Sequence, residues 1–366
     1  MNCKQNIKNL SKNQLEDYFI SSYEKSFRVE QLLNAIYNQR ISDFSQITNY
    51  PKKLREKIQN DFSLDSIKLI EKKECNNNLL KSKINNEFDF EEETTKFLFE
   101  LSDGQKIESV LIPAENRNTI CISTQVGCPV SCKFCASGKI NFSRNLELAE
   151  IVDQFLITER ISGKEISNIV FMGMGEPLLN FENVLKAIKI FLNQIHISRT
   201  KITLSTVGLV PEIKKLADEN VRVKLAISLH ATNDFKREKI IPIAKKYKIK
   251  DLLNAVEYYY NLTSVPVTYE YIVFDGFNNT SEDLKRLAKI TKMVNSKVNL
   301  IPFNDISFVS SKENDFSLKA ANQEIILDFA EKLRKLNVIA NIRNSSGANI
   351  FAACGQLARI FNSAVI

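Results

Sequence analysis

Short apolar runs alternate with longer amphipathic stretches from residue 119 onward. The short runs are rich in β-branched residues and predict six strands, at 119–123, 166–172, 201–206, 222–229, 267–274 and 297–303. The longer stretches repeat their apolar residues with a helical period and predict helices at 147–161, 181–194, 211–219, 250–262, 281–294 and 322–336. Strands that alternate with helices form parallel sheets with right-handed crossovers. Because six strands are too few for a closed eight-stranded barrel, we expect an α/β fold with a partial barrel that is open on one side.

The pattern before residue 119 differs and predicts two further parts. Residues 10–73 repeat their apolar positions with a helical period, and Ser11 and Pro51 are residue types favoured at helix starts. Residues 74–93 are polar and of low complexity, which favours a connector or an exposed hairpin. Two apolar runs then flank Asp103-Gly104, a tight-turn signal. We therefore expect a small helical N-terminal accessory domain at 1–73, a connector with a β-hairpin at 74–118, and the partial barrel with a C-terminal cysteine loop at 119–366.

The composition narrows the class of protein. The 366 residues are 44% hydrophobic and 25% charged, which is typical of a soluble globular protein. No apolar run approaches the roughly 18 residues that a membrane-spanning helix needs, and the N-terminus lacks the apolar segment of a secretory signal. The net charge of +7, with a pI near 8.8, is compatible with a polyanionic partner such as RNA.

A cysteine array follows the first strand of the predicted barrel. Cys128, Cys132 and Cys135 have a CxxxCxxC spacing, and Cys121 lies within the predicted strand, seven residues before Cys128. Gly127 breaks the strand pattern, so the three thiols stand in a loop, where they can surround one small volume. This spacing is typical of metal and redox chemistry in a reducing compartment rather than of a disulfide framework, so we expect a cytoplasmic protein that is not bound to a membrane.

The number of ligands distinguishes among metals. A structural zinc site closes its tetrahedron with four protein ligands, yet His196 and His230 are the only histidines and neither has zinc-finger spacing from the cysteines. Three cysteines without an evident fourth ligand favour a 4Fe–4S cluster with one iron open to a small molecule. The alternative is that the three cysteines are merely small buried apolar residues. Their density within eight residues argues against it.

Compact polar residues stand at the ends of the predicted strands. In parallel α/β folds the functional groups lie beyond the carboxyl ends of the strands. Each of these residues taken alone is more often a helix cap or a turn residue. Together they favour a ring around a ligand with hydroxyl, ammonium and carboxylate groups. The ring consists of Ser205, Ser228, His230 and Asn304, and the nearby turn adds Glu176, which can accept from an ammonium group, and Gly175, which permits a close approach of the backbone.

An isolated cysteine, Cys354, lies near the C-terminus in the run Ala352-Ala-Cys-Gly-Gln356. A cysteine between alanines is usually a core residue. Gly355 and the preceding Asn344-Ser-Ser-Gly347 instead favour an exposed turn, where the thiol could serve as a nucleophile.

Taken together, these motifs are similar to those of the RlmN-type radical S-adenosylmethionine (SAM) RNA adenine methyltransferases. The resemblance covers roughly residues 10 to 360, and it implies the partial barrel of the radical SAM enzymes and a helical N-terminal domain. It also implies methylation of carbon 2 of an adenine, at adenine 2503 of 23S rRNA and adenine 37 of the tRNA anticodon loop. It rests on Cys128-x-x-x-Cys132-x-x-Cys135, Met172-Gly-Met-Gly-Glu-Pro-Leu-Leu-Asn180, Ile227-Ser-Leu-His230 and Ala352-Ala-Cys-Gly-Gln-Leu357.

The resemblance implies a role for each matching residue. Cys128, Cys132 and Cys135 would hold the 4Fe–4S cluster. Two SAM molecules would be used per turnover, one to methylate Cys354 and one to form the radical that activates this methyl group. Glu108 would then remove the carbon 2 proton, and Cys121 would release the product by pairing with Cys354. The implied SAM contacts are Gly175, Glu176, Ser205, Ser228, Leu229, His230 and Asn304.

The resemblance implies RNA substrates and an electron donor of flavodoxin or ferredoxin type, and we expect a monomer. Two loops, at 305–319 and 344–351, depart from the family pattern, so the choice between rRNA and tRNA stays open. Two other activities also stay open: methylation of carbon 8 of the same rRNA adenine, as in the antibiotic-resistance type, and a radical SAM reaction that transfers no methyl group. The run from Met172 to Asn180 favours the carbon 2 type, and the pair Cys121 and Cys354 favours methyl transfer.

Overall fold

The computed structural model describes residues 4–75, 94–309, 318–343 and 347–358. One sheet of ten strands runs through it, in the order β14-β13-β12-β11-β10-β9-β6-β5-β4-β3. The strands from β14 to β6 all pair in parallel. They are β6 (Arg117–Cys121), β9 (Asn168–Phe171), β10 (Ile202–Thr206), β11 (Lys224–Ser228), β12 (Val267–Val273), β13 (Ser296–Pro302) and β14 (Ala340–Ile342).

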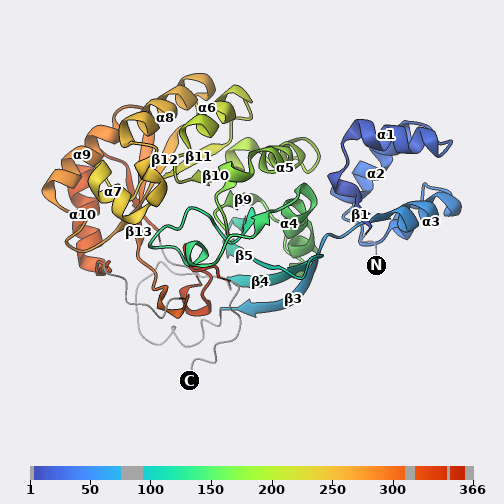
Figure 1. The fold of residues 1–366 in the computed structure, drawn as a ribbon, viewed down its shortest axis with the longest axis horizontal. Coiled ribbons are helices and arrows are strands. Elements are labelled where there is room, and N and C mark those ends of the chain that lie inside the picture. The colour runs from blue at the N-terminus through green and yellow to red at the C-terminus, as the bar shows by residue number, and fades with distance from the viewer. Residues whose placement is uncertain (1–3, 76–93, 310–317, 344–346, 359–366) are drawn as a thin grey trace.

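The parallel part confirms the predicted α/β partial barrel. Each of the six predicted strands overlaps one of β6 and β9 to β13. The seventh, β14, was not predicted, because three residues with a polar centre carry no alternating pattern. Helices lie outside the curved sheet (Figure 1). They are α4 (Leu148–Ser162), α5 (Phe181–Asn193), α6 (Val210–Asp218), α7 (Asp234–Ile240), α8 (Ile249–Thr263), α9 (Ser281–Thr291) and α10 (Gln323–Lys335), of which only α7 was not predicted.

Three antiparallel strands extend the sheet beyond β6. They are β3 (Ile67–Glu74), β4 (Thr95–Leu101) and β5 (Lys106–Ala114). The predicted hairpin is confirmed, since β4 pairs with β5 and Gly104 adopts the positive φ of 77° that its tight turn requires. The prediction of helix up to residue 73 is wrong for β3. This edge strand is rich in exposed Lys and Glu, which mask its strand pattern and protect a free edge. Of the predicted connector at 74–93, residues 76–93 lie outside the described residues.

The N-terminal part contains α1 (Lys12–Ser21), α2 (Phe27–Tyr37) and α3 (Lys52–Asp61), and its short strand β1 (Gln5–Asn6) pairs with β2 (Phe62–Ser63). Ser11 caps α1 as predicted, in a capping box. Figure 1 shows these helices beside α4. Two ion pairs fasten them there. Lys8 Nζ lies 3.0 Å from Asp153 Oδ1 with both side chains buried, and Arg40 Nε lies 2.6 Å from Glu159 Oε2.

Buried apolar side chains from both ends of the chain form one continuous cluster, which extends from Ile7 to Leu357. The N-terminal helices and the sheet therefore share a core, and the sheet is a rigid base for the loops at its strand ends. Among the described residues, no helix is both long and apolar enough to cross a bilayer.

Candidate functional site

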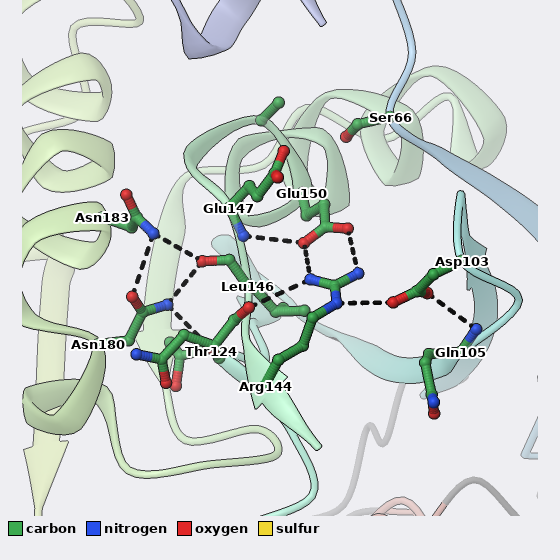
Figure 2. A network of polar contacts seen from close by, with 12 residues as sticks. Ser66, Asp103, Gln105, Thr124, Arg144, Leu146, Glu147, Glu150, Asn180 and Asn183 are labelled. Carbon is green, nitrogen blue, oxygen red and sulfur yellow. Dashed lines mark hydrogen bonds and ion pairs between the residues drawn. The ribbon is translucent and has the colours of Figure 1, made fainter. Parts of the chain in front are cut away.

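The cysteine loop begins and ends at a small antiparallel pair, β7 (Gln125–Val126) with β8 (Arg144–Asn145). Asn180 joins the two stems of this loop, because its Nδ2 donates to the carbonyls of Thr124 at 2.9 Å and Leu146 at 2.8 Å (Figure 2). Gly127 has a φ of 76°, and a Cβ there would lie 2.4 Å from the carbonyl oxygen of Asn141. Only glycine therefore fits at the start of the loop.

Arg144 ties the same stem to the hairpin and to α4 (Figure 2). Its Nη1 and Nη2 each donate to Glu150 at 2.8 Å, and its Nε donates to Asp103 Oδ2 at 2.7 Å. This fork holds the pKa of the Asp103 carboxyl below its usual value. A two-pronged contact of this kind fixes direction as well as distance, so the cysteine loop starts from an immobile base.

Cys128, Cys132 and Cys135 all line one cavity of about 990 Å³, including its open mouth. Burial raises the pKa of Cys128 to about 12 and that of Cys132 well above its usual value, and in both cases the charge of a neighbouring thiol adds to the rise. The described residues hold no group of three or more His, Cys, Asp or Glu side chains arranged around a single metal ion. In a 4Fe–4S cluster each thiolate binds a different iron, and three cysteines that line one open cavity can hold such a cluster.

The strand-end residues line the same cavity. Six of the seven predicted SAM contacts line it, namely Gly175, Glu176, Ser205, Ser228, His230 and Asn304. Leu229 does not. Its side chain is fully buried in the core, its N–H donates to the Glu270 carbonyl at 3.1 Å, and its carbonyl accepts from Arg237 Nε at 3.2 Å. The backbone of Leu229 is therefore occupied within the protein.

His230 presents a neutral ring to the cavity. Burial lowers its pKa to about 3, and the positive charge of Arg237 acts in the same direction. The Ile272 N–H donates to Nδ1 at 3.0 Å, so the proton of the neutral ring is assigned to Nε2. His230 also has a φ of 51°, an uncommon value for a residue other than glycine. This backbone turn places a hydrogen-bond donor, rather than a cation, at the end of β11.

Glu176 is a buried carboxyl at the turn after β9. Its Oε1 accepts from the Leu178 N–H at 3.1 Å and its Oε2 from the Val207 N–H at 2.8 Å. Burial nevertheless raises its pKa to about 7. Gly175 precedes it with a φ of 100°, and a Cβ there would lie 2.6 Å from Gln125 Cβ. The glycine therefore lets the turn after β9 approach the cysteine loop closely.

The two remaining thiols meet in a second cavity that adjoins the first and holds about 1190 Å³, including open solvent. Cys121 and Cys354 both line it, together with Arg117 and Arg343. Burial raises the pKa of Cys121 to about 12, and the charge of Cys354 adds to the rise. Cys354 as a residue is exposed, but its thiol is enclosed enough for burial to raise its pKa to about 11, an effect that Arg343 opposes. Cys354 lines both cavities and so stands between them.

Glu108 lies behind the residues that line these two cavities. Its side chain is fully buried, and it is absent from the lining of both cavities. Glu108 Oε1 lies 3.1 Å from Lys96 Nζ, and Oε2 accepts from the Ala358 N–H at 2.9 Å. Lys96 Nζ also donates to the Phe351 carbonyl at 3.3 Å. The buried pair Lys96–Glu108 thus holds both flanks of the Cys354 loop.

Sequence reasoning missed Arg343 and Glu270, which both line the main cavity. Arg343 Nη1 lies 3.7 Å from Glu270 Oε2, and Asn299 Nδ2 donates to Glu270 Oε1 at 2.9 Å. Arg343 follows β14, the strand that had no sequence signal, and Glu270 stands in the middle of β12. A charged residue within an otherwise apolar strand was the available signal for Glu270.

Comparisons with known proteins agree on the kind of site. The model of the radical SAM superfamily matches residues 122–289, and that of the ribosomal RNA large subunit methyltransferase N-terminal domain matches residues 5–64. The chain is 42% identical to a probable dual-specificity RNA methyltransferase RlmN from Thermotoga sp., over 96% of this chain and 97% of the relative. A relative of the same description from Flavobacterium johnsoniae is 39% identical over 97% of both chains. The crystal structure of a radical SAM methyltransferase from Sphaerobacter thermophilus superposes with a TM-score of 0.86 at 34% identity, over 97% of this chain and 100% of that one.

Proposed function

The chain belongs to the RlmN family of radical SAM RNA methyltransferases, and from this premise we propose that it methylates carbon 2 of an adenine, at adenine 2503 of 23S rRNA and adenine 37 of tRNA. Family membership implies RNA as the substrate, with a 4Fe–4S cluster and SAM as cofactors. The observation that carries the methyl-transfer proposal is that Cys121 and Cys354 line one cavity beside the three-cysteine loop, and the run from Met172 to Asn180 favours carbon 2 over carbon 8. A methyl-carrying thiol and a second thiol that releases it are the parts this route needs.

We assign the cofactors to the main cavity. Cys128, Cys132 and Cys135 would hold the cluster, and the six lining residues from Gly175 to Asn304 would hold SAM. When bound, these cofactors supply a carbon-centred radical that can activate a methyl group. The chain's own residues orient SAM and exclude water. Neutral His230 offers a donor from Nε2, and Glu176 holds the turns after β9 and β10 together through its two backbone contacts.

Cys354 would carry the methyl group. Its thiol must lose a proton before it can take a methyl group by displacement, and the Arg343 guanidinium favours the thiolate by lowering the pKa of Cys354 against the effect of burial. Carbon 2 of adenine is electron-poor and has no lone pair that could attack the methyl group of SAM, so a direct transfer to it is not possible. A methyl group on the sulfur of Cys354 would lie between the main cavity and the second cavity, which Cys121 also lines. One SAM molecule would supply this methyl group and another would supply the radical, so we infer that two SAM molecules are used in each turnover.

Glu108 and Cys121 would complete the reaction. The carboxylate of Glu108 would take the carbon 2 proton, once it is released from its contact with the Ala358 N–H. The thiolate of Cys121 would then attack the sulfur of Cys354, so that a disulfide forms as the carbon–sulfur bond to the product breaks. The bonding electron pair stays on the methylene carbon, which takes up a proton and becomes the methyl group of the product. An external reductant returns this disulfide to two thiols, and we propose a donor of flavodoxin or ferredoxin type for the electrons. We further propose that the protein acts as a cytoplasmic monomer, and that the N-terminal part before β3, with α1 to α3, helps to bind RNA.

The test is direct. The reconstituted protein is incubated with unmodified 23S rRNA fragments or tRNA, SAM and a reductant, and the nucleosides are identified by mass spectrometry. We expect 2-methyladenosine, and Cys354→Ala serves as the negative control. Formation of 8-methyladenosine would assign the chain to the carbon 8 type, and the absence of any methyladenosine from active, cluster-loaded protein would overturn the proposal.

A second variant tests the release step. Cys121→Ala should trap the covalent link between Cys354 and RNA, because no thiol remains to attack that sulfur. A denaturing gel after reaction should show a shifted band that nuclease removes. If Cys121 is only a core residue, the variant should turn over normally and lose at most about 1–3 kcal/mol of stability.

A further inference from the structure

Arg237 on α7 is a fully buried cation without a carboxylate partner. The described residues contain three buried cations, and the other two have partners, because Lys8 pairs with Asp153 and Lys96 with Glu108. Arg237 instead donates from Nε and Nη2 only to backbone carbonyls, and its Nη1 has no hydrogen-bond partner. Burial lowers the pKa of Arg237 only to about 10, so the side chain remains charged at neutral pH.

An unpaired buried charge is costly, because transfer from water to a medium of low dielectric constant removes its solvation. Backbone carbonyls return part of that loss. A full compensation requires a negative charge close by. Asp234, at the start of the same helix, supplies part of it by raising the pKa of Arg237, and the neighbours of Arg237 that become negative in the loaded protein could supply the rest.

The cysteine loop is the neighbour of α7. The Lys133 N–H donates to the carbonyl of Ile240, the last residue of α7, at 2.9 Å. Cys132 belongs to the same apolar cluster as Ile240 and Ile241. Arg237 Nη2 also donates to the carbonyls of Val207 and Ser228, and both of these residues line the cavity that Cys128, Cys132 and Cys135 line. The guanidinium therefore lies directly behind the lining of the proposed cluster cavity.

We propose that Arg237 is the counter-ion of the iron–sulfur cluster and that its positive charge, behind the cavity lining, raises the cluster's reduction potential. The proposal rests on the assignment of Cys128, Cys132 and Cys135 as cluster ligands. In the step concerned, one electron passes from an external one-electron donor to the cluster, and no bond forms or breaks. The cluster with its thiolates becomes one unit more negative, so a fixed positive charge in a poorly solvated site favours the reduced form.

The three carbonyls suggest a structural role that must be separated from the electrostatic one. Arg237 binds the carbonyls of Val207, Ser228 and Leu229, at the ends of β10 and β11, and could simply hold these strand ends in place. Arg237→Lys keeps the charge but loses the planar fork. Arg237→Gln keeps a donor group but loses the charge. If Arg237 has only a structural role, the two variants should have the same reduction potential. If it is the counter-ion, their reduction potentials should differ.

The experiment is a potentiometric titration of the reconstituted cluster, followed by visible absorption and electron paramagnetic resonance, without SAM and without RNA. Arg237→Gln should lower the equilibrium constant for reduction at least about tenfold, which is about 59 mV toward more negative potential for one electron. Arg237→Lys, which keeps the charge, should shift the potential by less than half as much. Lys239→Gln is the matched control, because it removes an exposed positive charge from the same helix and should leave the potential unchanged.

Equal potentials in wild type and Arg237→Gln, or equal shifts in the Gln and Lys variants, would overturn the proposal. Failure of both variants to fold would also overturn it, because holding the strand ends would then be the role of Arg237. Iron analysis of the wild type separates this result from the proposed function. Wild type that binds no cluster contradicts the cluster assignment itself, whereas a potential shift in a protein that makes no methyladenosine contradicts only the methylation.

Discussion

The two walls of the candidate site are built in different ways. The cofactor wall consists of the cysteine loop and the strand-end residues, each of which lies at the end of a strand or soon after it, as Ser228 ends β11 and Glu176 follows β9. The thiol wall consists of Cys121 and Cys354, with the pair Lys96–Glu108 buried behind them, and it comes from distant segments. Glu108 on β5 binds the backbone of Ala358 across 250 residues of sequence, and Cys121 on β6 meets Cys354 of the C-terminal loop. The first wall is local in sequence, and the second is assembled only by the complete fold.

This difference predicts a difference in rigidity. The cofactor wall is held by adjacent strand pairing and by buried contacts such as that of Asn180 with both stems of the cysteine loop. The Cys354 loop is held instead by single long-range contacts, which include the pair Lys96–Glu108, the donation from Asn304 Nδ2 to the Cys354 carbonyl at 3.1 Å and that from the Ala136 N–H to the Gly355 carbonyl at 2.7 Å. Contacts that no strand ladder supports open at a lower free-energy cost. The proposed reaction requires such opening, because Glu108 must reach the substrate.

The largest effect should come from breaking the cofactor wall. Cys132→Ala removes one of three proposed cluster ligands, so we expect loss of the cluster, no cleavage of SAM and no methyladenosine. Iron analysis and detection of deoxyadenosine measure the first two. Cys75→Ala is the control, since Cys75 is also buried but lies outside the cysteine loop. Full cluster occupancy in Cys132→Ala would contradict the assignment.

Breaking the thiol wall should be more selective. Cys354→Ala removes the proposed methyl carrier and leaves the main cavity's other residues in place. We expect a normal iron content, measurable uncoupled cleavage of SAM and no methyladenosine. If this variant still forms 2-methyladenosine, the methyl group travels by another path and the two walls do not have separate roles.

The same contrast explains which features the sequence predicts. The six barrel strands and the cofactor residues are visible because periodicity and motif lie next to each other along the chain, as in the run from Met172 to Asn180. β14 and Arg343, which follows it, could not be predicted, because a strand of only three residues shows no hydrophobic period. The burial of Glu108 is not visible either, since its partners Lys96 and Ala358 come from other strands and loops. Long-range pairing of charges leaves no local pattern.

Glu108→Gln should have an intermediate effect, because it weakens the contacts that hold the Cys354 loop and leaves those of the cofactor wall unchanged. The neutral amide loses the ion pair with Lys96 and presents a weaker acceptor to the Ala358 N–H. Hydrogen exchange at that amide should become at least about tenfold faster, while amides near Asn180 on the cofactor wall stay protected. The variant should also form little methyladenosine. Unchanged exchange at Ala358 would mean that the Cys354 loop is held by other contacts.

The smallest effect should come from the buried carboxyl of the cofactor wall. Burial raises the pKa of Glu176 to about 7 in the folded protein, from an ordinary value of 4.5, so the folded state binds this proton more tightly than the unfolded state. The resulting stability is fully present below the ordinary pKa and is lost as the pH rises toward 7, by at most a few kcal/mol. Glu176→Gln cannot ionise, so its stability relative to wild type should increase between pH 4.5 and 7 and level off above.

Denaturant unfolding of the protein without cofactors, across this pH range, measures the relative stability of Glu176→Gln. Glu182→Gln is the matched control, because Glu182 is an exposed residue whose pKa the partner Lys215 lowers, so its titration falls below the range and its curve should run parallel to that of wild type. Only the slope is compared, because the amide introduced by Glu176→Gln would replace one acceptor with a donor and lower the stability at every pH. Parallel curves for Glu176→Gln and wild type would mean that water reaches Glu176 in the folded protein. In that case the cofactor wall opens as readily as the thiol wall, and the rigidity that separates the two would have to come from the bound cofactors instead of from the chain.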